Sequence, residues 1–175
     1  LPLHGFVWRQ DLGYILGKYD LWSRYEPEQR GVVIAYASVY GGTENAANIL
    51  ACRLREQGVQ VEMFDTSVTP ASYILAAAFR FSHVVLAAPT YNGGVFVTME
   101  NLLHDLTAHG LKGRRAAYIE NGSWAPTSAR GMQKLLEPLN WETAADTVTL
   151  RSALRQGQQE DLERMAAQLA EGVKA

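Results

Sequence analysis

From residue 31 onward, the chain alternates between short apolar runs and stretches in which apolar residues recur every three or four positions. Unbroken runs such as Val32 to Ala37 and His83 to Ala88 are typical of strands buried on both faces. The recurring positions predict amphipathic helices. We predict strands over residues 32–37, 59–64, 83–88, 114–120 and 143–150, and helices containing the apolar stripes 47–54, 70–78, 99–106, 132–139 and 162–173.

Strands that alternate with helices predict an α/β fold in which helices cover both faces of a parallel sheet. Crossover connections between parallel strands are right-handed, so few topologies remain. The doubly wound order 2-1-3-4-5 is the common one for five strands. Such sheets bind ligands beyond the carboxyl ends of their strands, at the switch point between strands one and three. We therefore expect functional residues in the loops that follow the strands.

Residues 1–30 depart from this alternation. A helix is predicted by an apolar stripe at Leu12, Ile15, Leu16, Tyr19 and Trp22. Asp11 stands at its N-cap position, and a charged connector over residues 23–30 follows it. We predict an N-terminal extension over residues 1–30 and one domain over residues 31–175. Because the first residue is Leu1 rather than Met, we also expect a processed chain or a piece of a longer protein.

The composition is that of a globular domain with enough apolar material for a core, since 47% of the 175 residues are hydrophobic and 19% are charged. The formal charge of -2 and the pI near 6.1 give no electrostatic case for binding nucleic acid or a membrane. The single Cys52 cannot form an internal disulfide and fits the reducing cytoplasm. Because Cys52 falls within a predicted helix, we expect a buried structural thiol.

The loop after the first predicted strand has the features of a phosphate cradle. A strand stops, the chain turns on two glycines, and a helix begins whose first N–H groups have no intrahelical partner. These amides attract anions, and the hydroxyls of Ser38 and Thr43 can donate to phosphate oxygens. No Lys or Arg lies between Gly31 and Cys52, so neutral donors would hold a cofactor phosphate. The candidate residues are Ser38, Val39, Tyr40, Gly41, Gly42 and Thr43.

Two better-known phosphate loops do not fit this stretch. The P-loop requires Gly-Lys followed by Ser or Thr, which the chain lacks. The dinucleotide fingerprint requires three glycines that are missing here, although Asp65 ends the next predicted strand. A plain strand-to-helix turn explains one Gly-Gly pair equally well, so the interpretation depends on the neighbouring loops.

Two further loops follow strands three and four, and the predicted topology places them beside the first loop. Tyr91 and Trp124 could stack on an aromatic ring system, and backbone amides nearby could bond to its polar edge. Packing against the sheet explains either aromatic alone equally well. Together the three loops predict a site for a flat, phosphate-bearing ligand. The additional candidates are Pro89, Thr90, Tyr91, Asn92, Gly93, Gly94, Asn121, Gly122, Ser123 and Trp124.

These motifs resemble the flavodoxin-like domain of the flavodiiron proteins, also called A-type flavoproteins. The stretch Ser38–Thr43 resembles the flavin mononucleotide (FMN) phosphate loop of flavodoxins, and Pro89–Gly93 and Asn121–Trp124 resemble the two isoalloxazine loops. Residues His4–Arg9 look like the end of the metallo-β-lactamase-like diiron domain that precedes the flavin domain. The resemblance covers nearly the whole chain.

The resemblance implies an FMN-binding electron-transfer domain. It implies a rubredoxin-like or other donor protein, and an acceptor diiron site in the full-length chain or in a homodimer partner. In that family the histidine matching His4 is an iron ligand, but the H-x-E-x-D-H motif is absent here, and one histidine cannot make such a site. The remaining histidines, His83, His104 and His109, have no partners at ligand spacing. We expect neither a metal site nor catalytic residues in this chain.

Three functional classes stay open at this point. The first is the electron-transfer module, which would not complete oxygen or nitric oxide reduction alone. The second is a stand-alone NAD(P)H:quinone reductase or a flavodoxin-type carrier, and the third is a non-catalytic interaction domain. The fold alone does not distinguish these classes, and the three loops favour the electron-transfer module.

Overall fold

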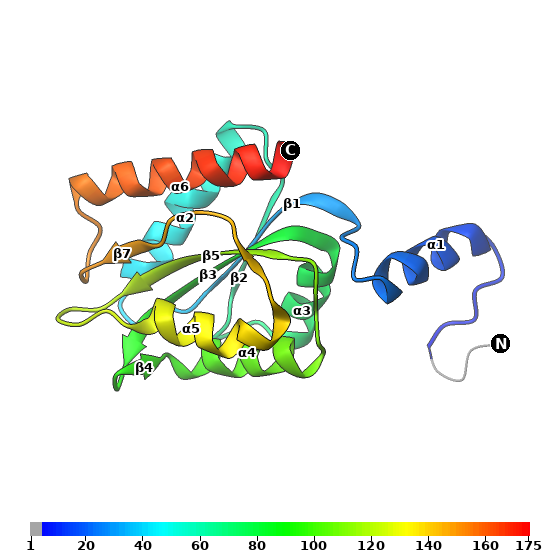
Figure 1. Cartoon of the computed structure of the whole chain (residues 1–175), viewed down its shortest axis with the longest axis horizontal. Helices are drawn as coiled ribbons and strands as arrows, with labels where there is room; N and C mark the ends of the chain where they lie inside the picture. The colour runs from blue at the N-terminus through cyan, green and yellow to red at the C-terminus, as the bar shows by residue number, and fades with distance from the viewer. Residues whose placement is uncertain (1–4) are drawn as a thin grey trace.

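Helices pack on both faces of a parallel sheet in the computed structural model, which describes residues 5–175 (Figure 1). The strands are β1 (Gln29–Tyr36), β2 (Val61–Asp65), β3 (Phe81–Tyr91), β4 (Gly94–Val95), β5 (Arg115–Asn121), β6 (Glu142–Thr143) and β7 (Val148–Leu150). The helices are α1 (Leu12–Ser23), α2 (Gly42–Glu56), α3 (Ala71–Arg80), α4 (Val97–Ala108), α5 (Ser128–Leu136), a 3-10 helix (Glu137–Leu139) and α6 (Gln156–Lys174).

The strand order is β2-β1-β3-β5-β6, and each of these neighbours pairs in parallel. This order confirms the predicted doubly wound arrangement, with β5 in the place of the predicted fourth strand. The register sets Ile34 of β1 beside Val85 of β3, and Val85 beside Ala117 of β5. The middle of the sheet is therefore apolar across its central strands, as expected when helices cover both faces.

Two details of the sheet differ from the prediction. The strand predicted over residues 143–150 is split into β6 and β7, which both pair with β5. Between them the Ala144 N–H still donates to the Ala116 carbonyl of β5 (2.7 Å), but the N–H of Asp146 donates to Gln168 Oε1 of α6 (3.0 Å), so part of this segment bonds to a helix instead of a strand. The second difference is β4, which pairs antiparallel with the end of β3. Asn92 and Gly93 connect them with φ of 50° and 75°, the left-handed values of a two-residue hairpin turn.

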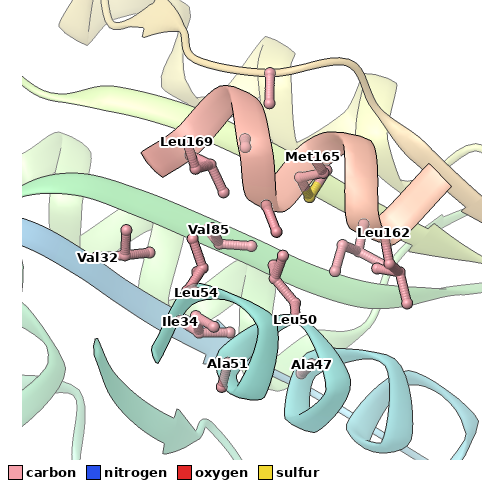
Figure 2. Close-up of a cluster of buried hydrophobic side chains, with 14 of the residues drawn as sticks. Val32, Ile34, Ala47, Leu50, Ala51, Leu54, Val85, Leu162, Met165 and Leu169 are labelled. Atoms are coloured by element: carbon pink, nitrogen blue, oxygen red, sulfur yellow. The ribbon is translucent and has the colours of Figure 1, made fainter. Parts of the chain in front are cut away.

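Each face of the sheet has its own apolar core. Helices α2 and α6 cover one face, where Leu50, Leu54 and Leu162 pack over Ile34 and Val85 (Figure 2). Helices α3, α4 and α5 cover the other face (Figure 1). Burying one side chain of this size stabilises the fold by ~1.5–3 kcal/mol. The cores therefore hold the strand ends, and the loops after them, in fixed positions.

At the amino ends of the strands, Arg114 is 2% exposed, and the bonds of its guanidinium to the described residues all go to carbonyl oxygens. It donates to Ala78 and Phe79 at the end of α3 (2.7 and 2.6 Å) and to Tyr25 of the connector (2.6 Å). Burial lowers the pKa of Arg114 to about 10, so the group stays charged at neutral pH. Arg114 thus ties the connector before β1 to the domain.

Helix α1 lies beyond the amino end of the sheet, apart from the other helices (Figure 1). None of its residues is buried, and the Trp22 indole at its end donates to Glu28 (2.6 Å). Asp11 stands at the predicted N-cap position, but its φ is 51° and its side chain caps no amide. The helix is confirmed, whereas the capping role is wrong. His4, which the sequence compared with an iron ligand, lies outside the described residues.

The prediction for Cys52 is also wrong, because the thiol is exposed. The buried side of α2 includes Ala47, Leu50, Ala51 and Leu54. Cys52 is the residue after Ala51 and therefore points away from that side. Among the helices described, none is both long and apolar enough to cross a membrane.

Candidate functional site

Four loops at the carboxyl ends of the parallel strands enclose a hollow of about 370 Å³, within the size range of small-molecule sites. In Figure 1 the loops after β5 and β7 lie at the left of the view, at the opposite end of the sheet from α1. The hollow is lined by Ser38, Val39, Tyr40, Gly42, Thr43, Pro89, Thr90, Tyr91, Asn121, Gly122, Ser123, Ser152 and Ala153. The structure therefore brings together residues from all three loops that the sequence singled out.

The first loop presents hydrogen-bond donors to the hollow. Gly41 is the N-cap of α2 with φ of 81°, and the first bond of the helix runs from Asn45 N–H to the Gly41 carbonyl (2.9 Å). The amides of Gly42 and Thr43 come before that bond and have no intrahelical acceptor. The Gly41 N–H donates to Ser38 Oγ (3.1 Å). Since this oxygen accepts, its own hydrogen can point into the hollow.

The electrostatics of the site come from neutral groups. Within residues 5–175, none of the residues lining the hollow carries a charge. Behind the first loop, burial raises the pKa of the Tyr36 phenol, and the nearby carboxylates of Glu44 and Asp65 raise it further. An anion in the hollow would therefore be held by amides, hydroxyls and the helix dipole, without help from a lysine or arginine in its wall.

The second loop contributes an aromatic wall on a rigid hairpin. Tyr91 lines the hollow, remains about half exposed and contacts Phe96 edge-on, with ring centroids 5.6 Å apart. The Oγ1 of Thr90 accepts bonds from the N–H groups of Thr127 and Ser128 at the start of α5 (2.8 and 3.1 Å). Of the other predicted residues, Asn92 and Gly93 form the turn of the hairpin and Gly94 begins β4, all three outside the lining.

The third loop divides into a buried part and an exposed part. Asn121 is 7% exposed, and Gly122 lies so close to Pro126 that a Cβ there would be 2.9 Å from the proline Cα. Ser123 lines the hollow as well. Trp124 is 91% exposed and does not line it. Its indole is therefore open to a ligand that reaches beyond the hollow.

A fourth loop, after β7, escaped the sequence analysis. Ser152 and Ala153 line the hollow, and Ser152 has φ of 67°. A Cβ on Gly42 would stand 2.4 Å from the Ser152 carbonyl oxygen, so the second glycine of the first loop makes room for this fourth loop. Ligands bind beyond the carboxyl ends of parallel strands, and this rule applies to the last strand as well as to the others. It could have predicted the fourth loop from the sequence.

A larger hollow of about 790 Å³ lies elsewhere, along β2 and α3. It is lined by apolar side chains such as Phe64, Tyr73 and Phe79, and its charged groups Glu62 and Arg80 bond to one another. Among the described residues there is also no group of three or more His, Cys, Asp or Glu side chains placed to hold a metal ion.

No family model matches the chain. Similar curated proteins include "Nitric oxide reductase" of Moorella thermoacetica, 29% identical over 136 residues (78% of this chain and 33% of that protein). Another is "Rubredoxin-oxygen oxidoreductase" of Megalodesulfovibrio gigas, 23% identical over 176 residues (99% and 44%). The chain thus spans less than half the length of these relatives.

Solved structures with a similar fold include flavodiiron proteins and flavodoxins. Rubredoxin oxygen:oxidoreductase from Desulfovibrio gigas has a TM-score of 0.86 at 22% identity and covers 93% of this chain and 40% of its own. The flavodiiron protein of Giardia intestinalis has a TM-score of 0.85 at 20% identity, covering 97% and 42%. A Streptococcus flavodoxin has a TM-score of 0.70 at 24% identity, covering 81% and 98%. The fold is flavodoxin-like, and the predicted resemblance to part of the flavodiiron proteins is confirmed.

Proposed function

We propose that this chain is an FMN-binding electron-transfer domain, the flavodoxin-like part of a flavodiiron oxygen or nitric oxide reductase. The observation that carries the proposal is the hollow at the switch point between β1 and β3. It combines unpaired amides and hydroxyls at the start of α2 with an aromatic wall at Tyr91. The names of the similar proteins support it, because they include flavodoxins and flavodiiron proteins.

The residues present fit the cofactor at both of its ends. The hydroxyls of Ser38 and Thr43 and the amides of residues 39–43 that have no protein acceptor would bind the phosphate, since they are neutral donors in the loop and the first turn of α2. Tyr91 and Trp124 would flank the ring system, with the peptides of residues 92–94 and 121–123 at its polar edge. Bound FMN supplies the one-electron chemistry, while the protein binds it, orients it and limits the access of water.

We further propose that residues 1–30 are an extension that joins this domain, residues 31–175, to a diiron domain in the same full-length protein. The structures of flavodiiron proteins cover 93% and 97% of this chain, whereas the flavodoxin covers 81%. This difference supports a link between the extension and the longer proteins. The acceptor would then be a diiron site of the same chain or of a homodimer partner, and the donor a rubredoxin-like protein. The exposed thiol of Cys52 supports a reducing, cytoplasmic location.

Reconstitution tests the proposal directly. The purified chain is mixed with FMN, and binding is followed by quenching of flavin fluorescence, with an expected Kd of about 1 μM or below. Reduced rubredoxin is then mixed with the FMN-loaded chain in a stopped-flow instrument, and bleaching of the flavin absorbance is expected. A chain that binds no FMN would overturn the proposal. Turnover of NAD(P)H with a quinone would favour the reductase alternative instead.

A further inference from the structure

We propose that Asn121 is a positioning residue that aims the Thr43 hydroxyl at the anionic end of the bound ligand. The sequence placed Asn121 among the candidate cofactor-binding residues. Asn121 lines the hollow, and its side-chain amide bonds to Ser152 and Thr43. The inference rests on the proposed function, because the anion concerned is the FMN phosphate.

The orientation of the Asn121 amide is defined by two bonds of opposite polarity to one residue. Its Oδ1 accepts the N–H of Ser152 (2.9 Å), and its Nδ2 donates to the carbonyl of Ser152 (2.9 Å). Exchanging the oxygen and the nitrogen would break both bonds, so the amide has one allowed orientation. Because Asn121 is 7% exposed, water cannot readily replace these bonds.

The second hydrogen of Nδ2 then determines the direction of the Thr43 hydroxyl. Nδ2 donates to Thr43 Oγ1 (3.3 Å), so the hydroxyl oxygen is an acceptor in this contact and its own hydrogen must point elsewhere. Thr43 is 2% exposed and lines the hollow. Within residues 5–175, Asn121 is its side-chain hydrogen-bond partner. Because the Thr43 oxygen already accepts a bond from Asn121, its hydroxyl hydrogen is left to donate to the ligand.

Ser38 repeats this arrangement on the other side of the same loop. Its Oγ accepts the Gly41 N–H (3.1 Å), which likewise leaves the hydroxyl hydrogen for the ligand. Two hydroxyls of one loop are thus turned into donors by protein N–H groups, one from the loop backbone and one from Asn121. This is the polarity that a phosphate, which only accepts hydrogen bonds when fully ionised, requires.

Asn121 also sets the distance between the walls of the hollow. The Ser152 carbonyl that it bonds is the oxygen that would stand 2.4 Å from a Cβ on Gly42. One amide therefore joins the end of β5, the start of α2 and the loop after β7. The left-handed backbone of Ser152, with φ of 67°, is held by the same two bonds.

The experiment compares FMN with riboflavin, which has the same ring system but no phosphate. Dissociation constants for both are measured by fluorescence quenching on the wild-type chain, Asn121→Ala and Thr43→Val. In each variant we expect FMN affinity to fall about tenfold, as for loss of a bond to a charged group. Riboflavin affinity should stay unchanged in Thr43→Val and should fall less than FMN affinity in Asn121→Ala, because the Asn121 amide also holds the walls of the hollow. In the double variant the FMN to riboflavin ratio should fall no further than in either single one, because both act through one hydroxyl.

Gln158→Ala is the matched control. Its amide bridges two backbone groups at the other end of the same loop, accepting the Arg155 N–H (2.9 Å) and donating to the Thr149 carbonyl (3.0 Å). It should lower the melting temperature without changing the FMN to riboflavin ratio. Equal losses for both flavins in Asn121→Ala would overturn the positioning role. So would an unchanged ratio in Thr43→Val, which leaves the amide bonds intact. A wild-type chain that binds neither flavin would overturn the proposed function, and this inference with it.

Discussion

Polar groups at the two ends of the sheet differ in their hydrogen-bond partners. At the amino ends of the strands, the buried guanidinium of Arg114 bonds to carbonyl oxygens of α3, of the connector and of its own loop. At the carboxyl ends, Ser38 and Thr43 accept bonds from the protein and keep their hydrogens. Both ends are polar, so polarity does not mark the site. A set of neutral hydrogen-bond donors gathered in a hollow at the start of a helix marks it. A single unpartnered group does not, since the buried His83 Nε2 at the amino ends also lacks a hydrogen-bond partner among the described residues.

A comparison of the two hollows shows that size does not mark the site either. The larger one, along β2 and α3, is about twice the volume of the one at the carboxyl ends. Its carboxylates pair with cations, Glu62 with Arg80 and Glu28 with Lys18, although the buried Nε of Arg80 has no hydrogen-bond partner among the described residues. The smaller hollow has neutral donors, an aromatic wall and a helix N-terminus. Volume alone would therefore have selected the wrong region for the proposed cofactor.

The largest expected effect is a loss of stability caused by a substitution at the amino end of the sheet. Replacing Arg114 with Leu removes the donor shared by the carbonyls of Ala78, Phe79 and Tyr25. We expect the free energy of unfolding to fall by ~3 kcal/mol or more, measured by urea titration, with FMN affinity unchanged in the folded protein. The neighbouring Arg115, exposed and paired with Glu142, is the control, because Arg115→Ala should cost less than ~1 kcal/mol. Similar losses in both variants would contradict the contrast.

A smaller effect is expected from pH, again at the amino end. Burial lowers the pKa of His83 to about 4, helped by the charges of Arg115 and Arg30. The folded state therefore favours the neutral imidazole. Its contribution is fully present above the ordinary pKa near 6.5 and is lost as the pH falls toward 4. We expect the free energy of unfolding to drop by ~1–3 kcal/mol over that window.

The variant His83→Gln, which cannot titrate, should show a shallower fall in urea midpoint between pH 6.5 and 4. The exposed His104 is the control, and His104→Gln should keep the wild-type pH dependence. If both variants follow the wild-type curve, protonation of His83 does not govern acid stability.

The smallest effect tests the carboxyl end. Trp124 is 91% exposed, so Trp124→Ala should leave the unfolding free energy unchanged and weaken FMN binding by ~1–2 kcal/mol if the indole stacks on the ring. Trp141 is the matched control, because its Nε1 donates to the Leu111 carbonyl (2.7 Å) and its ring is partly buried. Trp141→Ala should lower stability and leave affinity unchanged. Unaltered FMN affinity in Trp124→Ala would remove this residue from the proposed site.

Several features could be predicted because their causes are local. Apolar spacing placed the strands, the helices and the two covered faces of the sheet, since side-chain direction repeats within a few residues of the chain. The three loops followed from the strand order. The hairpin at Asn92–Gly93 was also within reach, because Asn-Gly between two extended segments is a strong turn signal. The exposed position of Cys52 could have been read from the helical stripe in the same way.

Other features required the tertiary structure, because their partners are distant in the chain. Asn121 bonds to Ser152, 31 residues away, and to Thr43, 78 residues away, and Arg114 reaches Tyr25 across 89 positions. No local spacing encodes such pairs. The sequence by itself therefore determined the flavodoxin-like order of elements and the candidate loops. Only the packing of the loops decided which polar groups bond to each other and which have a hydrogen left to donate to a ligand.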